Sequence, residues 1–95
     1  MGNLRRLVLD VLKPLDPNIV ELVLFLADLE GVDGVNISIN EIDRRVENVK
    51  ITIEGHDLNY QNIVQTIQEH GGSIHSIDEV AAGKMLIEDV ATSQD

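Results

Sequence analysis

The chain has 95 residues, of which 43% are hydrophobic, and this length and composition predict one folded domain with an apolar core. Seven Lys and Arg residues against 17 Asp and Glu residues give a formal net charge of −10, which repels nucleic acids and anionic membrane surfaces. Because cysteine is absent, disulfides, thiolate metal sites and cysteine nucleophiles are excluded. No run of residues approaches the roughly 20 apolar positions that span a bilayer, so we expect a cytoplasmic protein with neither nucleic-acid nor membrane partners.

The first predicted strand covers residues 4–13. Apolar side chains occupy both of its faces, which is typical of a central strand. The two alternating sets are Leu7, Leu9 and Val11 on one face and Arg6, Val8, Asp10 and Leu12 on the other. Pro14 lacks a backbone N–H group and is expected to end the strand.

A helix is predicted to follow this strand. Asp16 is the expected N-cap, with Pro17 at the first helical position. The helix should run to about residue 30, where Gly31 can adopt the left-handed conformation that ends many helices.

Apolar residues nearly surround this predicted helix. On a wheel of about 100° per residue, only Glu21 and Asp28 form a narrow polar strip. One buried face does not account for so wide an apolar arc. Leu24 and Phe25 are therefore predicted to lie in an interface between subunits.

Residues 35–54 predict a β-hairpin, because apolar and polar residues alternate on both sides of a short charged turn. The apolar sets are Val35, Ile37 and Ile39 in the first strand and Val49, Ile51 and Ile53 in the second. The remaining positions form a polar face, so one face of the hairpin belongs to the core and the other does not.

The turn of the hairpin carries the acidic residues Glu41, Asp43 and Glu47. A register that pairs Ile37 with Ile51 places Glu41 opposite Glu47, and a shift of two residues places Asp43 there instead. Facing carboxylates repel each other unless a cation lies between them, so calcium or magnesium is one interpretation. The alternative is neutralisation by a basic neighbour, for which the choices are Arg44, Arg45 and Lys50.

A second helix is expected to begin after Asn59, and its apolar stripe is formed by Tyr60, Ile63, Val64 and Ile67. Gly71 and Gly72 should end it. Residues 73–80 predict the last strand. Its apolar residues Ile74, Ile77 and Val80 do not fit a period of two, which indicates a β-bulge.

The last strand also contains the sequence H-S-I-D-E, with His75, Asp78 and Glu79 close to the expected position of Asp10 on the neighbouring strand. An imidazole nitrogen and these carboxylates could bind a metal or a small polar ligand. Strict alternation would place His75 and Asp78 on opposite faces, so a shared site requires the predicted bulge. A solvated edge strand is the alternative interpretation.

The predicted order is strand, helix, strand, strand, helix, strand, which defines an α+β fold of the ferredoxin-like βαββαβ type. Right-handed crossovers place the first and third strands at the centre of an antiparallel sheet, with both helices on one face. The open face then carries Arg6, Asp10, Lys50 and Glu54, whose alternating signs predict cross-strand ion pairs.

The domain is predicted to have a core of residues 4–83 and an extension of residues 84–95. The extension contains three consecutive apolar residues, Met85, Leu86 and Ile87, and Val90 continues the pattern. Such a run is costly if exposed, so we expect it to be ordered against another subunit.

Four stretches resemble the archaeal domain-of-unknown-function family numbered 211: LRRLVLDVLKP, EGVDGVNISINEID, ENVKITIEG and GGSIHSIDEVAAGK. The resemblance covers about residues 4–88. It implies a ferredoxin-like subunit that assembles into homo-oligomers, with ring assemblies expected, and it assigns no activity. Leu15 and Asp16 depart from the His-Glu pair associated with this segment, so a role for that histidine does not transfer to this chain.

The sequence contains neither a nucleotide-binding glycine motif nor a recognisable catalytic motif. The favoured interpretation is a small non-enzymatic module that self-associates, binds a divalent metal or polar ligand, and serves in regulation or scaffolding. Two alternatives are an enzyme with an interface active site, in which His75 acts as acid or base, and a regulatory small-molecule-binding domain.

Overall fold

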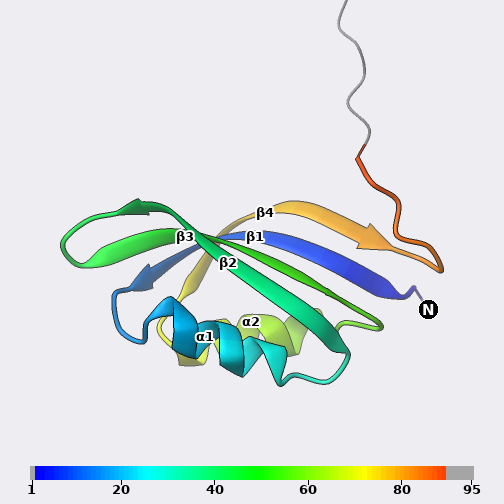
Figure 1. The fold of residues 1–95 in the computed structure, drawn as a ribbon, viewed down its shortest axis with the longest axis horizontal. Helices are drawn as coiled ribbons and strands as arrows, with labels where there is room; N and C mark the ends of the chain where they lie inside the picture. The colour runs from blue at the N-terminus through cyan, green and yellow to red at the C-terminus, as the bar shows by residue number, and fades with distance from the viewer. Residues whose placement is uncertain (1, 90–95) are drawn as a thin grey trace, which may run out of the picture.

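A computed structural model describes residues 2–89 and contains four strands and two helices in the predicted order (Figure 1). The strands are β1 (Leu4–Pro14), β2 (Val32–Ile42), β3 (Val46–Gly55) and β4 (Ser73–Ala82). The helices are α1 (Ile19–Ala27) and α2 (Tyr60–Glu69). The ferredoxin-like α+β fold expected from the sequence is therefore confirmed.

The four strands form one antiparallel sheet in the order β2-β3-β1-β4. The central pair β1 and β3 is continuous in register, from Arg6 opposite Glu54 to Pro14 opposite Val46. The strands β2 and β4 form the two edges, as the crossover rule predicts.

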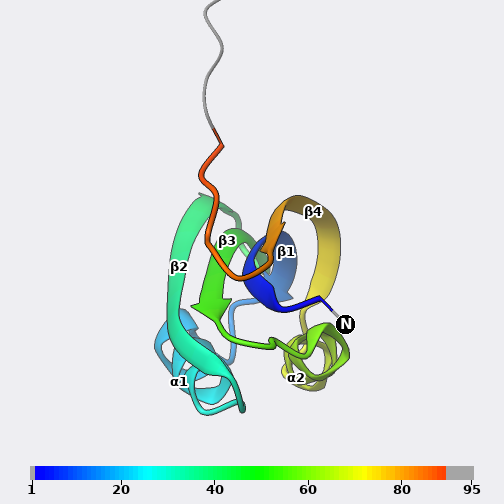
Figure 2. The ribbon, with the colours of Figure 1, turned by 90° about the vertical axis from the view of Figure 1, so that its right-hand side faces the viewer.

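The apolar core lies between the sheet and the two helices, which cover the same face (Figures 1 and 2). Its fully enclosed side chains come from β1, β3, α1 and α2: Leu7, Leu9, Val11, Leu22, Leu26, Val49, Ile51, Ile53, Ile63 and Ile67. Within residues 2–89, the other face of the sheet carries no helix (Figure 2). Arg6 and Asp10 lie on this open face because they alternate with the enclosed residues of β1.

The start of α1 differs from the prediction. Asn18, and not Asp16, is the N-cap, and its side chain accepts a hydrogen bond of 2.9 Å from the backbone N–H of Glu21. Asn is as good an acceptor as Asp at this position, and Asn18 directly precedes the first apolar residue of the helix. The helix also ends earlier than predicted, at Ala27, although Gly31 does adopt a positive φ of 86°.

The start of α2 agrees with the prediction, since the Asn59 side chain accepts a hydrogen bond of 3.0 Å from the backbone N–H of Asn62. The strand β4 also contains the predicted irregularity. Its register against β1 shifts between Val8 and Leu9 and again between Asp10 and Val11. Asp78 and His75 are the extra residues of β4 at these two shifts.

Within residues 2–89, no helix is long and apolar enough to cross a membrane.

Candidate functional site

The acidic turn between β2 and β3 does not have the predicted register. Ile37 does pair with Ile51, but the pairing shifts after Ile39, so Glu41 lies opposite Asn48 and Ile42 lies opposite Glu47. The extra residue in β2 at this shift is Asn40. The predicted opposition of two carboxylates across the hairpin is therefore wrong.

The Asp43 carboxylate is used within the turn itself. Its Oδ1 accepts hydrogen bonds from the backbone N–H groups of Arg45, at 3.0 Å, and Val46, at 2.9 Å. These two donors hold the pKa of Asp43 below its usual range, because they stabilise the ionised carboxylate. The side chain is exposed, and it closes the turn as an Asx motif.

Glu47 lies on the helix-covered face of the sheet, where its carboxylate contacts Lys13 of β1. Lys13 Nζ is 2.6 Å from Glu47 Oε1 and also donates a hydrogen bond of 2.7 Å to the carbonyl of Pro14. The exposed fractions of the two side chains are 0% and 6%. The residue that neutralises Glu47 is therefore Lys13, and none of the three basic residues considered from the sequence does so.

Glu47 is thus held away from Glu41 and Asp43 by its pairing with Lys13, whereas Glu41 and Asp43 line one cavity of about 110 Å³. Among residues 2–89, no group of three His, Cys, Asp or Glu side chains is placed so that it could hold a metal ion. A calcium or magnesium ion at Glu41 and Asp43 stays a prediction, and within one chain Glu47 is already paired with Lys13.

The four predicted ligand residues around β4 have different partners. Asp10 lies opposite Ser76 and accepts a hydrogen bond from the Asn48 side chain on β3. Asp78 accepts a hydrogen bond of 2.6 Å from the Ser76 hydroxyl. His75 is the extra residue at the second register shift and is exposed.

On the open face, the Arg6 guanidinium contacts three carboxylates. One of them belongs to Glu79, the fourth of the predicted ligand residues. Its guanidinium lies 2.8 Å from Glu54 on β3, 2.9 Å from Glu79 on β4 and 2.7 Å from Glu88, which follows β4. Glu88 receives two bonds, from Nη1 and Nη2. The bonds to Glu88, Glu79 and Glu54 raise the pKa of Arg6, and the bonds from Arg6 lower the pKa of Glu88.

The segment after β4 folds back on the sheet. Gly83 adopts a positive φ of 122° and donates a backbone hydrogen bond of 2.8 Å to Asn3. Arg5 Nη1 then donates to the Lys84 carbonyl at 2.9 Å. The remainder of the predicted extension, residues 90–95 with Val90, lies outside the described residues.

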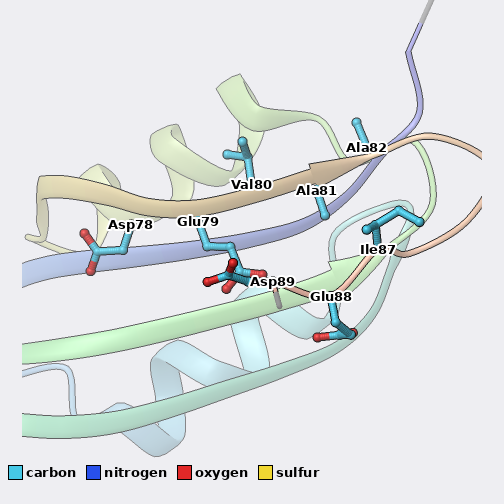
Figure 3. Close-up of a pocket in the computed structure, with 8 residues that line it drawn as sticks. All are labelled: Asp78, Glu79, Val80, Ala81, Ala82, Ile87, Glu88 and Asp89. Atoms are coloured by element: carbon cyan, nitrogen blue, oxygen red, sulfur yellow. The ribbon is translucent and has the colours of Figure 1, made fainter. Parts of the chain in front are cut away.

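A cavity of about 570 Å³ lies between this segment and β4 (Figure 3). Its lining combines five consecutive residues of β4 with three of the segment: Asp78, Glu79, Val80, Ala81, Ala82, Ile87, Glu88 and Asp89. Two of the four predicted ligand residues, Asp78 and Glu79, therefore belong to its wall. Asp10 and His75 do not.

The residues predicted to lie in an interface are exposed in the single chain. Leu24 and Phe25 on α1 have exposed fractions of 61% and 48%, and Phe25 also packs on the His70 ring with a centroid distance of 4.1 Å. In the segment after β4, Met85 and Ile87 are exposed by 71% and 67%, whereas Leu86 is half-buried.

Sequence reasoning missed two functional features of the site. The role of Lys13 was missed because a lysine at the end of an apolar strand normally lies in solvent, although its alternation with Val11 places it on the core face. The Arg6–Glu54 pair was predicted from the alternating charges of the open face, but Glu88 is 82 residues from Arg6 in sequence and no local pattern connects them.

These features define a small α+β domain of the ferredoxin-like type with an open, charged sheet face. The sequence matches the family DUF211, described as "Uncharacterized ArCR", over residues 5–95. It is also 54% identical to "Uncharacterized protein MJ0319" of Methanocaldococcus jannaschii over 95 residues, which cover 100% of this chain and 98% of that protein. The chain belongs to the DUF211 family.

Proposed function

We propose that this protein is a self-associating binding module, with a scaffolding or regulatory role and without catalysis of its own. The observation that carries the proposal is the outer face of α1, where Val20, Leu24 and Phe25 are exposed although they are large and apolar. A second chain that covers this face would remove the unfavourable contact of these side chains with water.

The sheet edges support the same proposal. On β4, Ile77 and Val80 lie on the helix-covered side of the sheet but are at least half exposed. The edge strands also present backbone N–H and C=O groups that a neighbouring chain could pair. Together, an apolar helix face and two pairing edges offer more than one surface for a second copy of the chain.

The test is the mass of the assembly in sedimentation equilibrium at micromolar concentration. Leu24→Glu places a charge in the proposed interface and should reduce the associated fraction at least tenfold. The matched control is Gln61→Glu, which adds the same charge to the exposed face of α2 and should leave association unchanged. A wild-type protein that sediments as a monomer would refute the proposal.

Binding of a small polar ligand or divalent cation is a second candidate function. The observation that favours it is the cavity of about 570 Å³, whose wall contains the carboxylates of Asp78 and Glu79. Carboxylate oxygens are the ligands that calcium and magnesium prefer. Calorimetry with each ion should show binding that is lost in Asp78→Asn and kept in Asp28→Asn, an exposed carboxylate at the C-cap of α1. The absence of heat at millimolar metal would reject this function.

An enzyme centred on His75 is not supported by the geometry. His75 is exposed at a bulge of β4, whereas Asp10 already receives a hydrogen bond from Asn48. In many active sites a further group orients the base, and none of the described contacts provides one for His75.

A further inference from the structure

The segment Gly83–Asp89 is held against the open sheet face almost entirely by polar contacts from two adjacent residues of β1. Arg5 donates to the Lys84 carbonyl at 2.9 Å, and Arg6 binds both carboxylate oxygens of Glu88 at 3.0 and 2.7 Å. Two of the three apolar side chains of the segment contribute little, since Met85 and Ile87 remain 71% and 67% exposed, and Leu86 is half-buried.

Release of the segment would leave no buried charge without a partner. The Arg6 side chain is only 11% exposed, but it keeps Glu54 at 2.8 Å and Glu79 at 2.9 Å when Glu88 departs. Glu88 itself is 66% exposed and returns to water. The usual large penalty for separating a buried ion pair is therefore absent when the segment is released.

The backbone before the segment is suited to a hinge. Gly83 has a φ of 122°, a conformation that other residues rarely adopt, and no heavy atom lies closer than 3.9 Å to the position of a Cβ atom there. Its N–H donates to Asn3 at 2.8 Å, which anchors the end of β4. The chain can thus swing after Gly83 without disturbing the sheet.

The segment also forms one wall of the cavity of about 570 Å³ beside β4 (Figure 3). Ile87, Glu88 and Asp89 supply that wall, and Asp78 and Glu79 lie on the wall formed by β4. Displacement of the segment would remove this wall of the cavity.

From these contacts we propose that residues 84–89 form an electrostatic lid, which Arg6 closes over the open sheet face and which salt releases. Added salt weakens the Arg6–Glu88 ion pair, because the Glu88 carboxylate is largely exposed and added ions screen its charge. The other charged groups that face this pair are Glu54 on β3, Glu79 on β4 and Asp89 within the segment.

The lid can be followed with one nitroxide label at Leu86→Cys, because Leu86 is the half-buried apolar residue of the segment and the natural chain has no cysteine. At micromolar protein and low salt, the spectrum should show a mostly immobilised label. About 1 M NaCl, where the Debye length falls to roughly 3 Å, should increase the mobile fraction several-fold. Glu88→Gln should produce the same increase at low salt, and the matched control Glu69→Gln, which changes an exposed carboxylate on α2, should not.

Two results would overturn the lid. One is equal label mobility in the wild-type background, in Glu88→Gln and at high salt. The other is immobilisation that disappears on dilution, because the segment would then be held by a second chain and not by its own Arg6. The lid rests on contacts within one chain, so it does not depend on the proposed self-association, and the dilution series distinguishes the failure of one proposal from that of the other.

Discussion

Lys13 and Glu47 form an enclosed ion pair on the helix-covered face of the sheet, with 2.6 Å between Nζ and Oε1. The two residues are direct neighbours in the register of β1 and β3. Lys13 also donates to the Pro14 carbonyl, so the ammonium group has two acceptors within the protein. The pair therefore joins the ends of the two central strands at the point where apolar alternation stops.

Removal of one partner of this pair should be strongly destabilising. Lys13→Met leaves the Glu47 carboxylate enclosed without a counter-charge, and we expect a loss of about 3–5 kcal/mol in the free energy of unfolding. The double variant Lys13→Met with Glu47→Leu should recover most of this loss, because no charge then remains to be desolvated. Urea unfolding of the three proteins measures both effects. Equal stabilities of the double and single variants would contradict the explanation.

The contrast between the buried and the exposed side of α1 gives a second prediction. Leu26 is fully enclosed, so Leu26→Ala should cost about 2–5 kcal/mol in the free energy of unfolding. Leu24 is mostly exposed, so Leu24→Ala should change the stability of the isolated chain by no more than about 0.5 kcal/mol. Both are measured by urea unfolding at a concentration where the protein is monomeric. A large loss for Leu24→Ala there would show that its side chain is buried within one chain.

The N-cap of α1 gives a third prediction. Asn18→Ala removes the acceptor for the Glu21 N–H and should cost about 1 kcal/mol in the free energy of unfolding. Asp16→Ala should have a much smaller effect, because the Asp16 side chain caps no helix. Thermal unfolding followed by circular dichroism compares the two variants. A larger loss of stability in Asp16→Ala than in Asn18→Ala would show that Asp16 is the N-cap, as predicted from the sequence.

The turn between β2 and β3 gives a prediction of pH dependence. The N–H groups of Arg45 and Val46 hold the pKa of Asp43 below its unfolded value, which is about 3.9. This contribution to stability is therefore present above about pH 3.9 and is lost as the pH falls through the lower, folded pKa. A carbon-13 titration of the Asp43 carboxyl group should show a midpoint below that of an unfolded aspartate. A midpoint at or above 3.9 would show that the two hydrogen bonds do not persist in solution.

The sequence predicted the fold well because the apolar periods are regular in most elements. The alternation of β3 and the stripe of α2 place Val49, Ile51, Ile63 and Ile67 in the core, where the structure has them. The bulge in β4 was also predictable, since Ile74, Ile77 and Val80 cannot share one face of a regular strand.

The candidate site was less predictable because its geometry depends on single-residue shifts. The extra residue Asn40 moves Glu41 away from Glu47, and a shift of one residue reverses the face of each side chain beyond it. The polar alternation of β2 gives no indication of this shift. The pairing of Arg6 with Glu88 depends on the path of the chain after Gly83, which residue types alone do not determine.

The last prediction concerns removal of the segment after β4. Truncation after Gly83 removes Glu88 and the Lys84 carbonyl, but it removes no residue of the apolar core, and Arg6 retains Glu54 and Glu79. We therefore expect a folded domain with an unchanged far-ultraviolet circular dichroism spectrum and a loss of no more than about 1 kcal/mol in the free energy of unfolding. The control is Glu88→Gln in the full chain, which should lose no more than the truncation does. An unfolded truncated chain would show that the segment contributes to the core and is not a separable lid.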